Sequence, residues 1–406
     1  MNFGIVNQWY PPETGGGGVA TYNVNLAHEL SSLGHRVVVV SSTHDRKPRL
    51  EFDKNIPVYR IPTPCIPSAL DRHLPVFGPY MRTFRALLYA WGVRKVLPAI
   101  VKEHQLDVLE YADSAAEAFF HNKKKLPPYG IRLHGPLFSI EPYYRGKETP
   151  YDIKYFKQME KKAIIRADIL TSPTWAFGEV VRKEYDMDPD RIQTIPHFFN
   201  ADNCQWFQNH HEKPGLTILF VGRLEYKKGA DIFANVIPLI DKKWPQTRYV
   251  YLAWDRPQPD GSSTKASLQS ILHQAGVLDK VSFLTAPEVN GCIYAALKPD
   301  ICVVPSRFEA FSYPCLESMA HGVPVVASRI CGIPEVVDDA VTGLLFDVGD
   351  VQGFADALDK LIQNSSMRSR LGKAAIERAN SDLFSPKMIA EKTIKIYEDL
   401  LKSQPD

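Results

Sequence analysis

The chain has 406 residues, more than one hydrophobic core usually holds, so its length favours two domains. Hydrophobic residues make up 45% and charged residues 23%, which is typical of a globular enzyme and excludes a disordered or fibrous protein. The formal net charge of +2 gives no strong overall field, and we expect no nucleic-acid partner.

The cysteines and the N-terminus indicate the cellular compartment. The six cysteines have neither CxxC nor metal-finger spacing, which favours reduced thiols in a core over a metal site. The start, MNFGIVNQWYPP, lacks the basic residues and the long apolar stretch of a signal peptide, and no apolar run is long enough to span a membrane. We therefore expect a cytoplasmic protein.

Short apolar runs alternate with helical patterns along the first half of the chain. A helix pattern, VATYNVNLAHELSSL, ends at Gly34, and β-branched strand patterns stand in NFGIVN, RVVVVSS, VLEYAD, GIRLHG and ILTSP. Strands of this kind separated by helices predict parallel sheets covered on both faces, the doubly wound α/β class.

The alternation restarts after residue 213, with strand patterns in TILFVGRL, YVYLAW, VSFLTA, ICVVPS, PVVAS and GLLF. The stretch between the two series is polar and has no periodicity, which is typical of a linker. We predict a first domain at 1–200, a linker at 201–215, a second domain at 216–380, and a C-terminal helix at 381–406 that packs back on the first domain.

Residues 72–102 gather positive charge, in part within MRTFRALLYAWGVRKVLPAIV. The cations are Arg72, Arg82, Arg85, Arg94, Lys95 and Lys102. Their mixture with apolar side chains at helical spacing fits a helix on an anionic membrane surface, at the inner face of the membrane. It also fits a helix that packs on a core and solvates its other face.

A glycine run stands in PETGGGGVATYN, residues 12–23. It fits the loose pattern of a dinucleotide fingerprint, but Gln8 to Thr14 separate it from the first strand, and no Gly-Lys-Ser/Thr follows as a P-loop requires. The sequence therefore indicates a longer loop whose backbone N–H groups, with the next helix N-terminus, can approach an anion. A mobile connector is the alternative interpretation.

A second motif follows the strand ICVVPS, in RFEAFSYPCLESMAHGVPVVAS. Pro314 belongs in the first turn of a helix, which places Glu309 in the loop before it and Glu317 on the second turn. This is the carboxyl end of a strand, where ligands bind in open α/β sheets. The two carboxylates could perform acid/base chemistry or accept hydrogen bonds from sugar hydroxyls.

A third motif is VGRLEYKKGAD, in which a strand ends at Arg223 and a helix begins near Gly229. Arg223 and Lys228 then flank one loop at the same sheet edge, an arrangement that suits a diphosphate. The alternative is a solvated basic pair.

Together these motifs resemble those of the retaining glycosyltransferases of family 4. The resemblance runs from PPETGGGGVATYN through GRLEYKKG to the E-x7-E stretch with GVPVVAS and GIPEVV, and it covers nearly the whole chain. It implies the GT-B architecture, an α/β fold of two facing Rossmann-like domains with parallel sheets and an interdomain cleft. It also implies that the first domain binds the acceptor and the second binds the nucleotide sugar.

The resemblance implies a role for each matching residue. Glu309 would bind the donor sugar, Glu317 the ribose, Arg223 and Lys228 the diphosphate, and His134 would lie near the sugar. The implied catalytic residues are Glu309, His134, Arg223 and Lys228. The implied donor-binding residues are Gly16, Gly17, Arg223, Lys228, Ala286, Glu309, Ala310, Phe311, Ser312, Tyr313 and Glu317.

The implied reaction is transfer of a hexose, with retention, from a nucleotide diphosphate sugar to a glycan or lipid-linked glycan. UDP is the preferred nucleotide, and no metal or other cofactor is expected, because fixed cations can stabilise the leaving diphosphate. Asp186-Met-Asp188 matches a DxD metal motif, but its polar setting favours a turn. The alternatives are a nucleotide-sugar epimerase and a non-catalytic nucleotide-sugar-binding protein.

Three features depart from the family pattern. Trp254 and Arg256, in YLAWDRPQPDGSS, stand where small residues are usual, and IPHFFN replaces an Asn-Gly pair. The glycine run is longer than the usual pair, and we expect Gly16→Val or Gly17→Val to lower turnover with little loss of fold.

Overall fold

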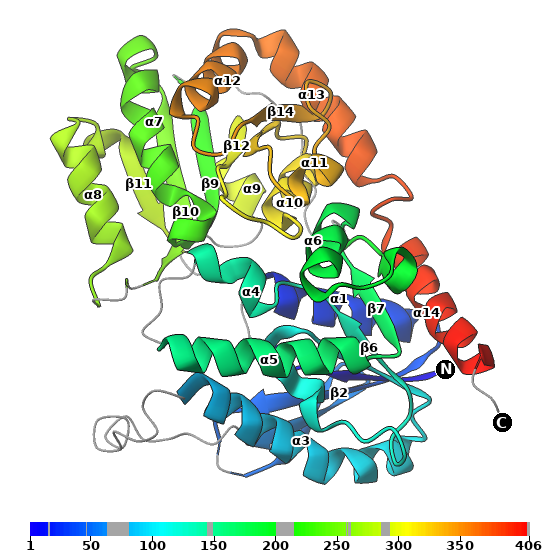
Figure 1. The fold of residues 1–406 in the computed structure, drawn as a ribbon. Helices are drawn as coiled ribbons and strands as arrows, with labels where there is room; N and C mark the ends of the chain where they lie inside the picture. Colours follow the sequence, from blue (N-terminus) through cyan, green and yellow to red (C-terminus); the bar gives the residue numbers. More distant parts are fainter. Residues whose placement is uncertain are drawn as a thin grey trace. The chain divides into compact units, whose positions relative to one another are not determined.

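The computed structural model describes residues 1–14, 17–45, 47–62, 81–143, 149–199, 215–256, 258, 261–285 and 293–403. Gly16, Arg72, Ala286 and all of the expected linker except Gly215 lie outside these residues. The chain divides into two compact units (Figure 1). The first comprises Met1–Glu141, Lys147–Phe198 and Pro386–Asp406, and the second comprises Pro142–Gly146 and Phe199–Ser385.

The sheet of the first unit has eight strands among the described residues, in the order β3-β4-β2-β1-β5-β6-β7-β8. Their bounds are β1 (Asn2–Val6), β2 (Arg36–Thr43), β3 (Arg49–Asp53), β4 (Ile56–Pro62), β5 (Val108–Ala112), β6 (Tyr129–Arg132), β7 (Ile169–Ser172) and β8 (Ile192–Thr194). The neighbours pair in parallel, which confirms the predicted fold class, except that β3 is antiparallel to β4. Only Lys54 and Asn55 connect these two strands, a turn too short for a parallel crossover.

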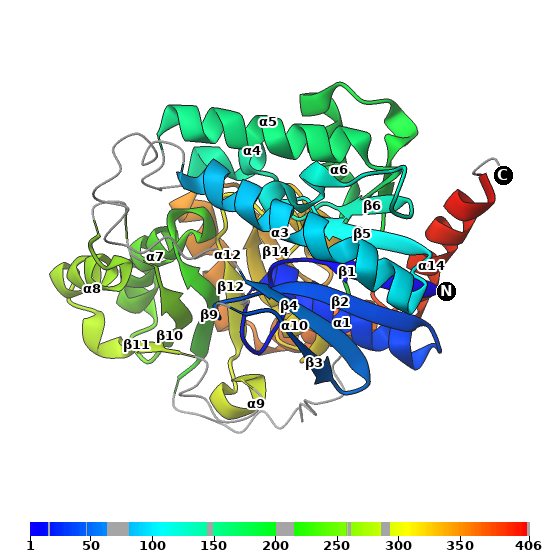
Figure 2. The same ribbon diagram turned by 90° about the horizontal axis from the view of Figure 1, so that it is seen from below.

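Helices cover both faces of this sheet. They are α1 (Gly18–Ser32), α3 (Met81–His104), η2 (Ser114–Phe120), α4 (Leu137–Ile140), α5 (Pro150–Arg166), α6 (Trp175–Tyr185), η4 (Pro189–Arg191) and α14 (Pro386–Ser403). The short η3 (Glu141–Tyr143) begins in this unit and ends in the second. Figure 2 shows α3 running beside α5, and the basic helix α3 buries Tyr89, Val93 and Leu97 on one side. In the described part of the chain, no helix has the length and apolar composition needed to cross a bilayer.

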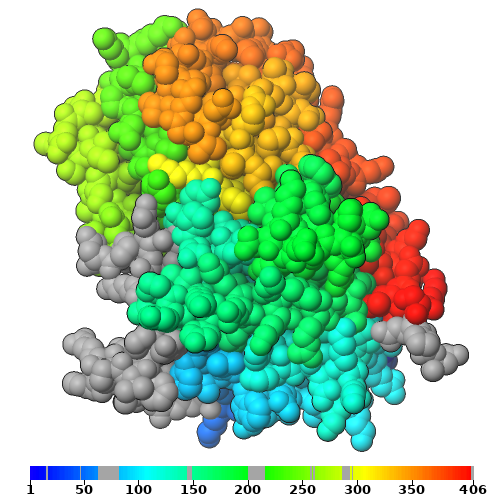
Figure 3. Space-filling view, in the orientation of Figure 1, coloured from blue at the N-terminus to red at the C-terminus, as the bar shows by residue number. Residues whose placement is uncertain are grey.

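The last helix, α14, is part of the first unit although it follows the second in sequence. It lies beside α1 (Figure 1). Its residue Ile389 packs with Ile195 and Phe198, and the red surface of α14 adjoins the green surface of the segment that precedes residue 198 (Figure 3). The hydroxyl of Tyr397 donates a hydrogen bond to Glu110 Oε2 at 3.1 Å, and its ring packs edge-on against Phe3 at 5.0 Å. A Cβ at Gly130 would lie 2.1 Å from that hydroxyl, so glycine makes room for the helix.

The second unit holds a parallel sheet of six strands within the described residues, in the order β11-β10-β9-β12-β13-β14. The strands are β9 (Thr217–Leu224), β10 (Arg248–Asp255), β11 (Val281–Leu284), β12 (Ile301–Val304), β13 (Val325–Ser328) and β14 (Gly343–Phe346). From β9 the chain first adds strands on one side and then, with β12, on the other. The strand order therefore reverses between β9 and β12, which is a topological switch point.

Helices cover the two faces of this second sheet. They are η5 (Tyr226–Lys228), α7 (Ala230–Lys243), α8 (Thr264–Gln274), η6 (Leu278–Lys280), α9 (Ile293–Leu297), α10 (Tyr313–Ala320), α11 (Ile333–Val336), α12 (Val351–Gln363) and α13 (Ser365–Ala379). One core cluster joins the sheet to α7, α8 and α12, and a second joins it to α10 and α13. The helix α10 thus lies on the opposite face from α7.

Candidate functional site

An ion pair between Lys228 and Glu309 occupies the switch point of the second unit. Lys228 ends η5, which follows β9, and Glu309 lies in the loop that follows β12. The Lys228 Nζ lies 2.5 Å from Glu309 Oε1, which also accepts a hydrogen bond of 3.0 Å from the Ser306 hydroxyl. Both side chains are largely buried, with 17% and 6% of their surfaces exposed. A charged pair therefore stands where open α/β sheets bind ligands.

Arg223 lies at the end of β9, at the same edge of the sheet as Lys228. Its guanidinium donates to Glu225 Oε1 at 2.8 Å, and the other oxygen of Glu225 accepts from Arg256 at 3.5 Å. Both cations predicted for a diphosphate thus lie at the carboxyl end of one strand, and each faces a carboxylate of its own unit.

The helix α10 presents the second glutamate of the motif. Pro314 stands in its first turn, and Ser312 caps it by accepting a hydrogen bond of 3.4 Å from the Cys315 amide. Glu317 follows on the second turn, as the sequence predicts, and burial raises the pKa of its carboxyl to about 7. Ala310, Phe311, Ser312 and Tyr313, which precede or begin the helix, are all buried.

His134 belongs to the first unit and follows β6. Its backbone amide donates to Asp113 Oδ2 at 2.9 Å, and its ring stacks on His197 with 5.4 Å between centroids. Its Nε2 atom is buried without a hydrogen-bond partner. Burial, together with the nearby charge of Arg132, holds the pKa of the imidazole well below its usual value. The ring is therefore neutral at neutral pH and can offer one nitrogen to a ligand.

Gly17 caps the N-terminus of α1 in a conformation that other residues avoid. Its φ is +94° and its ψ is −178°, and no atom lies within 4 Å of the place that a Cβ would take. Such a backbone is almost restricted to glycine, so local conformation alone requires glycine here. The expectation that Gly17→Val leaves the fold nearly unharmed is therefore wrong, because valine would add strain.

A buried arginine that the sequence motifs do not reveal holds the start of the glycine loop. Arg60 of β4 donates to the carbonyl oxygens of Tyr10 at 2.7 Å and Pro11 at 2.9 Å. Glu13 accepts hydrogen bonds of 2.5 Å from Thr43 and 2.9 Å from the His44 amide. Side chains distant in sequence thus fix the loop up to residue 14.

A second such contact braces the loop that carries Glu309. The guanidinium of Arg307 forms a bidentate pair with Asp231 of α7, with distances of 2.7 and 2.6 Å, and lies 3.8 Å from the ring centre of Tyr226. The backbone amide of Arg307 donates to the carbonyl oxygen of Lys227 at 2.8 Å, and the pKa of Lys227 is lowered to about 8 by burial and then by Lys228. The sequence shows two adjacent lysines, Lys227 and Lys228, but it does not show that Lys227 is desolvated.

Neither carboxylates nor histidines gather into a metal site in the part of the chain that the structure describes. Asp186 ends α6 in a left-handed conformation, and Asp188 precedes η4. The DxD stretch is therefore the turn that the sequence favoured.

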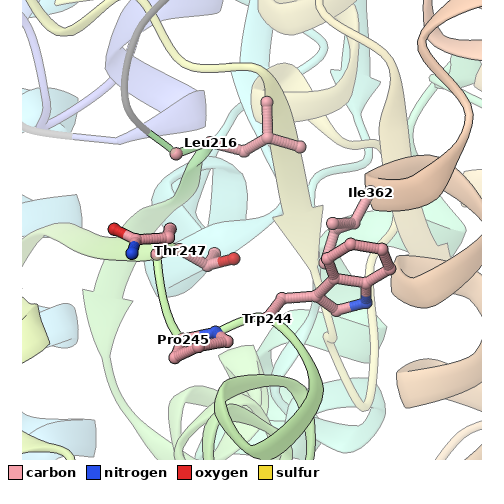
Figure 4. A pocket seen from close by; sticks show the side chains of 7 residues that line it. Leu216, Trp244, Pro245, Thr247 and Ile362 are labelled. Carbon is pink, nitrogen blue, oxygen red and sulfur yellow. The ribbon is translucent and has the colours of Figure 1, made fainter.

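One apolar pocket lies away from these side chains (Figure 4). It has a volume of about 300 Å³ and is lined by Gly215, Leu216, Trp244, Pro245, Gln246, Thr247 and Ile362. Apart from Ile362 of α12, these residues lie at the amino ends of β9 and β10, whereas Lys228 and Glu309 lie at the carboxyl end of the sheet. The pocket is therefore separate from the charged site.

Comparison with known families agrees with this geometry. Residues 16–203 match the model of Glycosyltransferase Family 4, and residues 204–378 match the model of Glycosyl transferases group 1. Two parallel-sheet α/β domains with an E-x7-E motif at the switch point define a glycosyltransferase of the GT-B fold. The chain belongs to the family 4 (group 1) retaining glycosyltransferases.

Curated relatives are similar over part or all of the chain. A D-inositol 3-phosphate glycosyltransferase of Corynebacterium efficiens is 28% identical over 66% of this chain and 65% of its own length. The corresponding enzyme of Corynebacterium jeikeium is 34% identical over 59% of each chain. The chain thus spans less than two thirds of the length of these relatives. An uncharacterised glycosyltransferase of Methanocaldococcus jannaschii is 26% identical over 98% of both chains.

Solved structures share the fold. The sucrose-phosphate synthase of Thermosynechococcus elongatus aligns over 100% of both chains with a TM-score of 0.78 and 19% identity. Anabaena HepE in complex with UDP and glucose aligns over 98% of this chain and 100% of its own, with a TM-score of 0.71 and 16% identity. At these identities the likeness establishes the architecture.

We expect Glu317 to make the stability of the protein depend on pH. Its pKa is about 7 in the folded chain and about 4.3 in an unfolded one, so folding favours the protonated carboxyl. Its contribution to stability is complete below pH 4.3 and is lost as the pH rises to 7, with a slope of at most about 1.4 kcal/mol per pH unit. Denaturant unfolding of wild type and Glu317→Gln from pH 4 to 8 measures this contribution as a difference.

The exposed Glu377 of α13 provides the control, since Glu377→Gln should follow the wild-type curve at every pH. A difference between wild type and Glu317→Gln that stays constant across this range would contradict the assignment.

For the glycine loop, we expect Gly17→Val to lower both thermal stability and turnover. The strain at a positive φ costs about 1–3 kcal/mol, and a side chain at the loop would also hinder a ligand. Gly34, at the other end of α1, has a φ of +86° and an equally open Cβ position, so Gly34→Val should show the stability loss alone. Equal turnover in the two folded variants would show that the loop only connects β1 to α1 and does not contact a ligand.

Proposed function

We propose that the protein is a retaining hexosyltransferase that moves a hexose from a nucleotide diphosphate sugar to a glycan or lipid-linked glycan. The observation that carries the proposal is the Lys228–Glu309 pair at the switch point, with Arg223 beside it and Glu317 on the next helix. The second unit would hold the donor and the first unit the acceptor.

The charges suit this reaction. When the bond between the anomeric carbon and the diphosphate oxygen breaks, its electron pair goes to the diphosphate, and Lys228 and Arg223 stabilise the negative charge that develops. The acceptor oxygen bonds to the anomeric carbon on the same face, and its proton passes to the departing phosphate oxygen. Glu309 accepts hydrogen bonds from the sugar hydroxyls and stabilises positive charge at the carbon, so no metal and no protein nucleophile is required.

UDP is the preferred nucleotide in this proposal. HepE, whose fold is similar, is described in complex with UDP and glucose, whereas starch synthase IV of Arabidopsis thaliana is described as bound to ADP and acarbose. Both support a nucleoside diphosphate as part of the donor. The name of the Corynebacterium efficiens relative, D-inositol 3-phosphate glycosyltransferase, supports an acceptor with hydroxyl groups.

A peripheral membrane contact forms part of the proposal because α3 exposes cations. Arg85, Arg94 and Lys95 are exposed, and the last two lie against the exposed ring of Trp91, at 5.0 and 5.7 Å from its centre. An aromatic ring flanked by cations suits the interface of an anionic bilayer, where a lipid-linked acceptor would lie.

The test of the function is nucleotide diphosphate release from a panel of donor sugars with glycan acceptors. Lys228→Ala should lower kcat about 10²- to 10³-fold, because it removes a fixed charge at the leaving group. The matched control is Lys280→Ala, which breaks another half-buried ion pair of the same unit, with Asp241 at 2.6 Å, away from the site.

Release of no nucleotide diphosphate from any donor would refute the transferase. Epimerisation of a donor incubated alone, seen by NMR, would identify an epimerase. Equal activities of the two lysine variants would remove Lys228 from the mechanism.

The membrane contact has its own test, sedimentation with phosphatidylglycerol vesicles. Replacing Arg85, Arg94 and Lys95 together by glutamine should weaken binding at least tenfold, since each surface cation contributes about 1 kcal/mol. Arg82 is left unchanged because it packs on Phe156 at 4.7 Å. Gln at Lys387, Lys395 and Lys402, all exposed on α14, is the charge-matched control. Absence of binding by the wild type would end this part of the proposal.

A further inference from the structure

Trp254 is a large aromatic side chain left exposed at the edge of the second sheet. It stands near the end of β10, and 56% of its surface is accessible to solvent. Its neighbour in register on β9 is Arg223, one of the two cations assigned to the diphosphate. An exposed indole at the carboxyl end of a strand offers a ligand a large apolar surface to cover, because tryptophan buries more apolar area than most side chains.

Side-chain alternation determines the face on which the indole lies. In β10, Val250 and Leu252 pack in the core cluster that contains α10. The residues between them pack in the opposite cluster, with α7: Tyr249, Tyr251 and Ala253. Because residues two apart in a strand share a face, Trp254 continues the series of Val250 and Leu252. The indole therefore lies on the α10 face, beyond the end of the buried core.

Arg223 lies on the same face. Leu219 and Val221 of β9 pack in the α10 cluster, and Arg223 follows them at the same spacing. Leu224, the next residue, returns to the α7 cluster, so the alternation holds to the end of the strand. The indole and the guanidinium are thus side by side, on the face whose helix carries Glu317.

The backbone beside Trp254 is held in place. Asp255 accepts a hydrogen bond of 2.6 Å from the Ser263 hydroxyl and one of 3.0 Å from the Lys265 amide, which ties the strand end to the start of α8. On the other side, Glu225 joins Arg223 to Arg256. The backbone that carries the indole is therefore fixed before a ligand binds, so its ordering adds little to the entropy lost on binding.

We propose that Trp254 stacks on the base of the donor nucleotide. This inference rests on the proposed function, in which Glu309 after β12 binds the sugar, and Arg223 at the end of β9 and Lys228 after it bind the diphosphate. The strands lie in the order β12, β9, β10, and the parts of the donor follow one another as sugar, diphosphate and nucleoside. The nucleoside is therefore the part of the donor that reaches β10. Carboxylates satisfy the hydroxyls of the sugar and ribose, and the planar base is the part that an indole binds best, through its π-face.

The test measures binding of UDP, GDP, ADP and inorganic pyrophosphate to four proteins. These are the wild type, Trp254→Ala, Trp254→Phe and the control Trp175→Ala, which removes a tryptophan 65% exposed on the first unit. Trp254→Ala should weaken the binding of all three nucleotides about tenfold, the usual worth of a stacked base. Trp254→Phe should recover most of this loss, and pyrophosphate should bind all four proteins equally.

The outcomes separate the inference from the function on which it rests. Equal weakening of pyrophosphate and nucleotides by Trp254→Ala would show that the indole shapes the loop, and it would overturn the stacking. Unchanged nucleotide binding by Trp254→Ala would also overturn it, while leaving the transferase intact. A wild type that binds no nucleotide would refute the proposed donor class itself. Quenching of tryptophan fluorescence by UDP, retained in Trp175→Phe and absent in Trp254→Phe, is the confirming readout.

Discussion

The ion pair between Lys228 and Glu309 is the interaction on which the rest of the site depends. It joins the loop that follows β9 to the loop that follows β12. These strands are neighbours in the sheet, and from them the chain continues to opposite sides, so the parallel sheet itself sets the distance between the two loops. Leaving either charge buried without its partner would cost about 3–5 kcal/mol, and each group therefore keeps the other in place. The pair of Arg307 with Asp231 ties the same two segments together from the side of α7. Charge is thus positioned before a ligand arrives, which is the condition for stabilising a leaving group without reorganisation.

Much of this fold could be predicted from sequence because its signals are local. Runs such as RVVVVSS and ICVVPS are strands in the structure, and two parallel-sheet units follow from their alternation with helices. The antiparallel strand β3 was not among the predicted strands. Its exposed Leu50 and Phe52 alternate with polar residues, the pattern of an edge strand rather than of a buried run. The packing of Tyr397 could not be predicted from the sequence, because its partners Glu110 and Gly130 are hundreds of residues away in the chain.

The same distinction separates the parts of the site. Pro314 marks the start of a helix by its own chemistry, so the loop position of Glu309 and the helical position of Glu317 could be read from the spacing. Arg60, Glu13, Asp231 and Arg307 carry no motif, since ordinary charged residues acquire their meaning only from what they contact. The raised pKa of Glu317 and the lowered pKa of His134 also needed the structure, because burial, the first cause of both, is a property of the folded chain.

The positions where this chain departs from local preference are also the positions that the proposed reaction uses. Gly17 adopts a backbone that costs other residues strain, Trp254 leaves an indole in water, and His134 buries a nitrogen without a partner. The unpartnered nitrogen of His134 lowers the stability of the unliganded protein, whereas Gly17 is the residue that its backbone conformation requires. The three residues recur at one kind of place, the carboxyl ends of β1, β6 and β10, where parallel strands deliver side chains and helix N-termini to a ligand. Within the second unit, the planar base of the proposed nucleotide would cover the indole of Trp254, and its diphosphate would meet the neighbouring guanidinium of Arg223.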